Sequence, residues 1–321
     1  MITLFVGPMS MNTMMVLKEL SINNTIGVVA SRRQIEHDGG YVNNWNTKQF
    51  SEFMREAKML TLVRDHGGPG QGLDEDDGLD SFAKDTMYLD IIHIDPWKQS
   101  TTMETGLQKT GSLINFCYNL NPQILFEVGT EQSIFPMTAE DLSFLLSGLK
   151  SSLQDKIFKN IVYAVIQSGT SLSGNTNTGK YDKQKLMDMI YVCKKYGLQS
   201  KEHNGDYLPI ELVKEKEKLG LDAINIAPEF GKIETECILE EIAGKKRYIN
   251  EFFKLCLESD RWQKWVPADF DPKKNKIELI KICGHYVFSN PKFIVLKEKV
   301  DNGHLDIKIK KAVSKRIMEF L

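Results

Sequence analysis

Short runs of apolar residues recur along the chain, and segments with helical spacing separate them. The runs are rich in Ile, Val and Leu, and most do not alternate with polar residues, which is typical of strands buried on both faces of a parallel sheet. Eight runs occur, at residues 2–6, 25–30, 59–63, 89–94, 124–128, 161–166, 198–201 and 223–227. The run at 198–201 is the weakest, because it is polar.

The intervening segments predict helices. They lie at residues 12–20, 47–57, 139–153, 182–196 and 210–219. Thr138 and Asp182 occupy cap positions at two of their starts. Eight strand–helix alternations favour an α/β fold of the closed (β/α)8 type, a TIM barrel. An open doubly wound sheet is the alternative, but no GxGxxG motif follows the first run, which disfavours a dinucleotide-binding version.

The pattern changes after the eighth run. Residues 233–259 have a helical pattern, and a basic helix begins near residue 306. A length of 321 residues fits one barrel of about 250 residues plus an appendage. We therefore predict a barrel over residues 1–245 and a helical C-terminal extension over 246–321, packed on the barrel as a cap or an oligomer surface.

Composition narrows the class of protein. Hydrophobic residues make up 41% and charged residues 26%, and the net charge is −2, so the chain is globular and nothing indicates bulk nucleic-acid binding. Five cysteines are scattered without a CxxC pair, which predicts reduced thiols and a cytoplasmic location. No apolar stretch approaches the roughly 20 residues that span a bilayer, and the first residues do not resemble a signal peptide.

Polar residues follow the apolar runs, where a barrel carries its chemistry. Each alone has a structural explanation, such as a hydrogen-bonded histidine at a strand end. Together they suggest a divalent metal, because buried charge is costly unless it is paired or bound to metal, and histidine with carboxylate suits zinc. The residues are Ser31, Arg32, Arg33 and Gln34; Arg64, Asp65 and His66; His93 and Asp95; Glu127, Thr130 and Glu131; Gln167 and Ser168; Glu202, His203 and Asn204; and Asn225.

Two local patterns constrain this reading. Neighbouring strand residues point to opposite faces, so Asp65 and His66 cannot both point inward from regular strand, and one must lie on the turn. Residues 174–181 fit GxxxxGK but carry Tyr181 where a phosphate loop needs Ser or Thr, so we reject a nucleoside triphosphatase. The same Ser/Thr/Asn-rich loop, with Lys180, remains a candidate to hold a sugar or a phosphate.

The motifs resemble those of the tagatose-bisphosphate aldolase accessory subunit (GatZ/KbaZ) family over about residues 2–245. Residues 31–41 resemble its second-strand segment. The other matches are RDHGGP at 64–69 to the family's GDHLGP, IHID at 92–95 to IHLD, VGTE at 128–131 to IGTE, QSG at 167–169 to QPG, and EHNGDY at 202–207 to EAHSTDY. The resemblance implies a barrel related to class II, metal-dependent aldolases, among relatives that are either 4-epimerases or non-catalytic partners of an aldolase.

The resemblance also implies roles for particular residues. Asp65 and His66 match the Asp-His pair that supplies an acid/base aspartate and a metal-ligating histidine in class II aldolases. His203 matches a second ligand, and Asn225 a substrate contact. We expect Glu131 to be the third ligand, with Glu127 or Asp95 in reserve, and Glu131 and Asp95 to join Asp65 as catalytic carboxylates. We expect Arg32, Gln34, Ser168, Lys180 and Asn225 to bind the substrate, with Lys180 and Arg32 as partners for a phosphate or carboxylate.

The chain departs from the family at three places. Arg64 replaces a glycine, and Pro96-Trp97 replaces small residues. Little remains of the family's SDRIRYYWP segment, which residues 284–289 resemble only weakly. These departures leave the substrate open, including whether it carries a phosphate.

Two functions are compatible with these residues. The first is a metal-dependent aldolase or epimerase, with zinc as the expected divalent ion, acting on a ketose, ketose phosphate or related sugar. The metal stabilises an enolate, a carboxylate moves the hydroxyl proton, and epimerisation follows if the aldehyde turns over and recombines. The second is a non-catalytic subunit that stabilises a partner aldolase. A homo-oligomer is open in either case.

Overall fold

The structure is a computed structural model that describes residues 2–57 and 59–321. Eight parallel strands close into a barrel in the order β1-β10-β9-β6-β5-β4-β3-β2. Their bounds are β1 (Thr3–Val6), β2 (Ile26–Ser31), β3 (Leu60–Gly67), β4 (Ile91–Ile94), β5 (Leu125–Val128), β6 (Ile161–Ile166), β9 (Gln199–Glu202) and β10 (Ala223–Ile226). The predicted (β/α)8 barrel with C-terminal helices is therefore confirmed.

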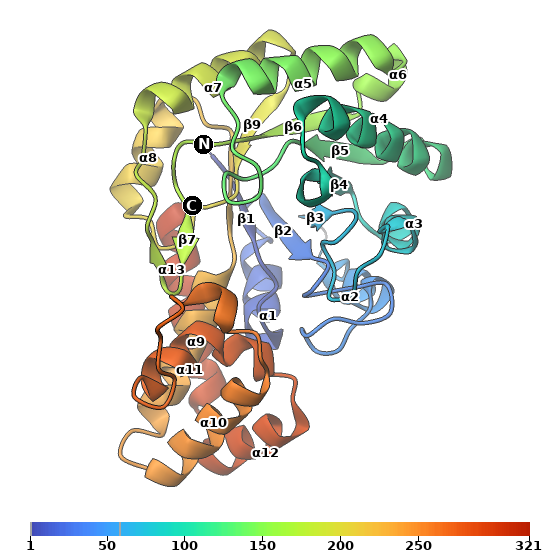
Figure 1. Cartoon of the computed structure of the whole chain (residues 1–321). Coiled ribbons are helices and arrows are strands. Elements are labelled where there is room, and N and C mark those ends of the chain that lie inside the picture. Colours follow the sequence, from blue (N-terminus) through green and yellow to red (C-terminus); the bar gives the residue numbers. More distant parts are fainter. Residues whose placement is uncertain (1, 58) are drawn as a thin grey trace.

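Helices surround this barrel (Figure 1). They are α1 (Met11–Leu20), α2 (Thr47–Met54), α3 (Leu79–Tyr88), α4 (Met103–Leu120), α5 (Ala139–Ser152), α6 (Asp155–Phe158), α7 (Lys183–Lys195), α8 (Ile210–Lys218) and α9 (Pro228–Glu241). The predicted caps are present, since Thr138 accepts from the Asp141 backbone N–H and Asp182 from that of Lys185. A short hairpin of β7 (Leu172–Ser173) and β8 (Thr176–Asn177) interrupts the loop after β6.

The last part of the chain is helical. It contains α10 (Lys246–Glu258), α11 (Lys276–Cys283), α12 (Pro291–Val300) and α13 (Leu305–Phe320), with short 3-10 turns at Gln263–Trp265 and Gly284–Val287. Figure 1 shows α10, α11 and α12 gathered below the barrel. The terminal helix α13 instead returns to pack on α1, α8 and α9, where it completes the ring of helices. The division at residue 245 therefore stays a prediction.

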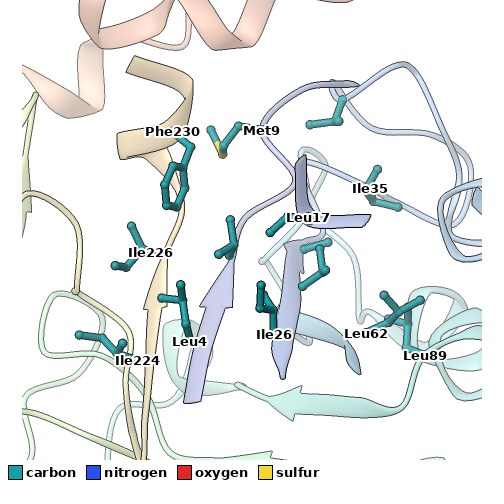
Figure 2. Close-up of a cluster of buried hydrophobic side chains, with 14 of the residues drawn as sticks. Leu4, Met9, Leu17, Ile26, Ile35, Leu62, Leu89, Ile224, Ile226 and Phe230 are labelled. Carbon is teal, nitrogen blue, oxygen red and sulfur yellow. The ribbon is translucent and has the colours of Figure 1, made fainter. Parts of the chain in front are cut away.

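Two apolar clusters form the core. One lies between the strands and the helices, and Figure 2 shows part of it, with Leu4 of β1 beside Ile224 of β10, its partner in the parallel register. Met9 and Phe230 continue this cluster beyond the strand ends, toward the C-terminal helices. The other cluster fills the barrel interior and includes Phe5, Val63 and Tyr163.

The polar strand β9 is stabilised by ion pairs on both of its faces. Lys201 points into the barrel, where its Nζ lies 2.7 Å from Glu127 Oε2 and 3.9 Å from the centroid of the Phe5 ring. Glu202 points outward, where its Oε2 lies 2.5 Å from Lys216 Nζ on α8. Buried ions need such partners, so the polarity that weakens the strand pattern reflects two internal salt bridges.

Two further features concern the cysteines and the length of the helices. The five cysteines are all buried and free. Among the described residues, no helix combines the length and the apolar character needed to cross a membrane.

Candidate functional site

Three imidazoles and one carboxylate meet at the C-terminal ends of the barrel strands. Asp65 and His66 lie at the end of β3, His93 lies on β4, and His203 directly follows β9. One potential ligand atom from each of the four lies within 4.8 Å of the others. The three imidazole centroids are 4.9 to 5.1 Å apart, so the rings surround a common point.

A distortion of β3 brings both Asp65 and His66 to this point. The pairing of β3 with β4 shifts register between Arg64 and Gly67, and His66 has a φ of 46°, in the left-handed region. Both residues lie within β3, so the expectation that one of them lies on the turn is wrong, and an irregularity inside the strand turns both toward the cluster instead. A left-handed conformation at a non-glycine residue costs free energy, and such strain concentrates at functional sites.

Each imidazole has one nitrogen bound by an oxygen outside the cluster. His66 Nδ1 lies 2.6 Å from Asp95 Oδ2, His93 Nε2 lies 2.9 Å from the Gly129 carbonyl, and His203 Nε2 lies 2.5 Å from Glu127 Oε1. In the neutral rings these acceptors place the lone pairs on His66 Nε2, His93 Nδ1 and His203 Nδ1, and the lone pair of His93 accepts from the His66 backbone N–H. Metal-ligating histidines have this kind of outer partner.

The inner nitrogens of His66 and His203 have the spacing of a small metal ion's ligands, and that of His93 lies within 4.8 Å of both. His203 Nδ1 lies 3.3 Å from His66 Nε2, and His93 Nδ1 accepts a hydrogen bond of 3.2 Å from the His66 backbone N–H. Ligand nitrogens around tetrahedral zinc, at Zn–N bonds of about 2.0–2.1 Å, lie roughly 3.3–3.4 Å apart. The residues present therefore fit a divalent ion.

The charges around the cluster also favour a cation. Burial by itself lowers the pKa of His66, but the Asp65 carboxylate and the hydrogen bond to Asp95 outweigh it and raise the pKa to about 10. Burial lowers the pKa of His93 to about 4, so this ring is neutral at pH 7. Burial acts to raise the pKa of Glu127, but Lys201 and His203 lower it overall. A site that holds a proton this firmly attracts a metal cation for the same electrostatic reason.

Asp65 is the carboxylate of the cluster and is half-buried. Its Oδ1 is 3.4 Å from His203 Nδ1 and accepts a hydrogen bond of 3.3 Å from Asn225 Nδ2. Two buried oxygens, Asn225 Oδ1 and Thr130 Oγ1, have no hydrogen-bond partner among the described residues. An unpaired buried acceptor or hydroxyl is costly, and a bound ligand would satisfy it.

The other predicted carboxylates lie outside the group of ligand atoms. Asp95 is fully buried behind His66, and its Oδ1 accepts from the Trp97 backbone N–H at 3.3 Å. Glu131 is half-buried, accepts from Ser133 Oγ at 2.6 Å, and acts on His66 only through its charge. Glu131, the expected third metal ligand, is therefore outside the cluster, and His93 lies within it.

Three of the predicted substrate-binding residues are engaged within the protein. Arg32 is buried, with Nε 2.6 Å from Glu36 Oε2 and NH2 2.5 Å from Asp76 Oδ2. Gln34 accepts from the Ser31 backbone N–H at 2.8 Å. Ser168 donates to Glu202. These groups shape the loops, so a substrate would have to displace existing bonds to reach them.

Lys180 and Asn225 are placed differently. Lys180 is exposed in the loop after β8. No carboxylate oxygen of the described residues lies within 4.0 Å of its Nζ. Asn225 is the predicted substrate residue that the structure brings to the imidazole cluster. Arg64, which departs from the family, points away from the cluster to a buried salt bridge with Asp85 of α3, at 2.7 Å.

Sequence reasoning missed two features. His93 was placed at a strand end but not named as a ligand, although its position inside a buried strand was a signal. Residues 259–267 read SDRWQKWVP and share Ser259, Asp260, Arg261 and Pro267 with SDRIRYYWP at the same spacing. This segment shares more positions with that pattern than residues 284–289 do.

Solved structures share this fold. A probable tagatose 6 phosphate kinase from Sinorhizobium meliloti has a TM-score of 0.77 at 15% identity, over 99% of this chain and 98% of that one. The YdjI aldolase from Escherichia coli has a TM-score of 0.58 at 12% identity, over 99% and 88%. The fructuronate-tagaturonate epimerase UxaE from Cohnella laeviribosi has 0.63 at 10% identity, over 99% and 81%.

These identities are low, so the likeness establishes the fold. No protein-family model matches the sequence. No curated protein matches it either.

Proposed function

We propose that this protein is a metal-dependent, class II-type aldolase or epimerase that acts on a ketose, a ketose phosphate or a related sugar derivative. The observation that carries the proposal is the convergence of three imidazoles, each fixed by its own outer acceptor, beside the carboxylate of Asp65. The aldolase and the epimerase that share the fold support aldol chemistry for a site of this composition.

In this proposal His66, His93 and His203 hold the metal, and zinc is the best candidate. Three neutral nitrogen ligands suit zinc and leave a fourth position for substrate oxygen. His93 takes the place that we first expected for Glu131, because its Nδ1 belongs to the cluster and the Glu131 carboxylate does not. When bound, the ion would act as a Lewis acid that polarises the substrate carbonyl.

Asp65 is then the acid/base. Its carboxylate lies beside the imidazoles and is half-buried, so it can reach a hydroxyl of a bound sugar. Burial raises the pKa of Asp65, but His66 and His203 lower it overall, which keeps the carboxylate ionised and able to take a proton. Asn225 holds Asp65 in position with its amide, and its unpaired Oδ1 is available to accept a hydrogen bond from the substrate.

Removing the hydroxyl proton allows the neighbouring carbon–carbon bond to break and an aldehyde to form. An aldolase releases that fragment. An epimerase lets it turn over and recombine, so both reactions use the same residues. The phosphoryl transfer named for one structural neighbour lacks support here, because the GxxxxGK-like loop ends at Tyr181 and folds into the β7–β8 hairpin.

Metal analysis combined with a substrate screen tests the proposal. The purified protein should contain about one equivalent of zinc or bind it on addition, and His66→Ala and His203→Ala should abolish this. Ketoses, ketose phosphates and uronates should then be assayed with Zn²⁺ or Mn²⁺ for cleavage and for epimerisation. Metal-dependent turnover that disappears in both histidine variants is the expected result.

The accessory-subunit function predicts a different outcome of the same experiment. The protein would then turn over none of these sugars but would increase the activity or stability of a separately supplied class II aldolase. That result would replace the enzymatic proposal.

A further inference from the structure

A second polar site lies between the barrel mouth and the C-terminal helices. A cavity of about 260 Å³ is lined by Arg33 from the loop after β2 and by Arg261 and Lys264 from the segment between α10 and α11. We call it the basic cavity. Tyr286 also lines it, and its hydroxyl accepts a hydrogen bond of 3.0 Å from Trp265 Nε1. This cavity brings together segments more than two hundred residues apart in sequence.

The cations of the basic cavity have no carboxylate partner. Among the described residues, none of Arg33, Arg261 and Lys264 lies within 4.0 Å of a carboxylate oxygen. Arg33 Nε donates to the neutral Gly72 carbonyl at 3.1 Å. Asp260 also lines the cavity, but its carboxylate accepts from the Gln263 side-chain amide. The cavity therefore has an excess of positive charge.

Arg261 is held in place without its hydrogen bonds being satisfied. Its guanidinium lies 5.2 Å from the Tyr41 ring centroid and 5.7 Å from that of Tyr286, distances at which cation–π attraction orients it. Its NH1 is buried and has no hydrogen-bond partner among the described residues. A buried guanidinium nitrogen without an acceptor is costly, and it is the donor that a phosphate or carboxylate oxygen would use.

The cations also repel one another. The charges of Arg33 and Lys98 act to lower the pKa of Lys264, whose side chain is exposed at the cavity. The charge of Arg33 likewise acts to lower the pKa of the exposed Lys98, whose Nζ donates to the Gly70 carbonyl at 3.3 Å. Like charges gathered in one place cost free energy, and a bound anion would offset that cost.

The basic cavity and the imidazole cluster lie at the same end of neighbouring strands. Arg33 follows the C-terminal end of β2, which pairs with β3, and the C-terminal end of β3 carries Asp65 and His66. The charge of Glu131 acts on His66 and also on Lys264. A sugar whose reactive carbons lie at the imidazoles can therefore extend one end toward Arg33, Arg261 and Lys264.

We propose that the basic cavity binds the anionic group, a phosphate or a carboxylate, of a sugar whose reactive carbons lie at the imidazole cluster. The proposal rests on the proposed function for the position of the reactive carbons. It moves the anion site from Arg32, whose guanidinium is already paired with Glu36 and Asp76, to Arg33 and to residues of the C-terminal segment. Arginine provides planar, paired donors that match both anions.

The test measures anion binding separately from turnover. Inorganic phosphate, a ketose phosphate, a uronate and an uncharged ketose are titrated into the full chain by calorimetry, with and without added Zn²⁺. Phosphate alone should bind without metal. The ketose phosphate identifies a phosphate as the natural group and the uronate a carboxylate, according to which binds more tightly. The uncharged ketose should bind more weakly than both.

Variants assign the binding to the basic cavity. Arg33→Met and Arg261→Met should each weaken anion binding by about 10- to 100-fold, as expected for loss of a charge-assisted hydrogen bond. The matched controls are Arg247→Met, on the exposed face of α10, and Lys150→Met, an exposed lysine whose Nζ lies 6.0 Å from the Tyr196 ring centroid. Both should bind the anions as the wild type does. If Arg261→Met does not fold, Arg261→Lys and Lys264→Met replace it.

Two results would overturn the proposal. One is equal anion affinity in the wild type, Arg33→Met and Arg261→Met. The other is turnover of uncharged ketoses that is as efficient as turnover of the charged sugars. The second result leaves the proposed function standing. Conversely, anion binding that depends on Arg33 and Arg261, in a protein that turns over none of the sugars, keeps the basic cavity and rejects the enzymatic proposal.

Discussion

At the scale of single residues, the direction of each side chain distinguishes the proposed metal ligands from the proposed acid/base. The three imidazoles have their outer nitrogens occupied by Asp95, the Gly129 carbonyl and Glu127, which leaves their inner nitrogens for an ion. Asp65 Oδ1 instead accepts a hydrogen bond from the Asn225 side-chain amide. In the proposed function the same four-residue group therefore provides both the ligands and the acid/base.

Asp65→Asn tests this separation. Asn keeps the size of the side chain but cannot act as the base, so kcat should fall by about 10²–10⁴-fold. Metal content should stay at the wild-type level, because the three imidazoles are unchanged. Turnover is measured on the substrate that the screen identifies, and metal content by mass spectrometry. Asp188→Asn, an exposed position on α7, is the control. Near-normal turnover of Asp65→Asn would reject the assignment.

Glu127→Gln tests the outer partner of His203. Gln keeps an acceptor but loses the charge that orients the imidazole and pairs with Lys201, so metal affinity should fall by about 10- to 100-fold. Competition with a fluorescent chelator measures the affinity. Glu131→Gln is the matched variant and should bind metal as the wild type does. A comparable loss in Glu131→Gln would instead restore Glu131 as a ligand.

At the scale of elements, buried ion pairs join the strands to the helices that cover them. Glu202 of β9 pairs with Lys216 of α8, and Arg64 of β3 pairs with Asp85 of α3. Arg64 also donates to the Ala30 and Ile35 carbonyls, at 2.9 and 2.6 Å, so it ties the loop after β2 to the same helix. These pairs fix the registers and loops on which the imidazole cluster depends.

Arg64→Ala should destabilise the protein strongly. It leaves the Asp85 carboxylate buried without a partner, which typically costs about 3–5 kcal/mol. Urea unfolding at pH 7 measures the free energy of unfolding. Arg247→Ala removes an exposed helical pair with Glu251 and should leave the unfolding curve unchanged. If Arg64→Ala lost no more stability than that control, Arg64 would not be a structural residue, and its departure from the family would need another explanation.

At the scale of the whole molecule, the cluster joins three strands that are far apart in sequence. A metal bound to β3, β4 and the end of β9 therefore binds the folded chain in preference to the unfolded one. The segment between α10 and α11 reaches the same end of the barrel, since its Arg261 and Lys264 line the basic cavity together with Arg33.

Metal removal should lower the thermal stability of the folded protein. Ligand present at about 100 times its Kd stabilises a protein by roughly 2.7 kcal/mol, so a chelator should lower the unfolding midpoint and added Zn²⁺ should restore it. Differential scanning calorimetry measures both changes. The double variant His66→Ala/His203→Ala should respond to neither reagent. A chelator effect that persists in this variant would locate the metal elsewhere.

Local patterns in the sequence determined the barrel. Apolar runs and helical spacing depend on near neighbours in the chain, so the eight strands and the caps at Thr138 and Asp182 could be predicted. The strand-end rule then placed Asp65, His66, His203 and Asn225 at one end of the barrel. The alternation of side chains along a strand also predicted that Asp65 and His66 could not both point inward from a regular strand.

Only the tertiary structure decided which of the strand-end residues meet. His93, not Glu131, completes the imidazole cluster, because strand register and the direction of the Glu131 loop set that distance. Arg32 is paired within the protein while Arg33 faces a cavity, although the two are adjacent in sequence. Arg261 and Lys264 reach the barrel mouth from the C-terminal segment. Such contacts depend on how distant elements pack, which the spacing of residues along one chain does not contain.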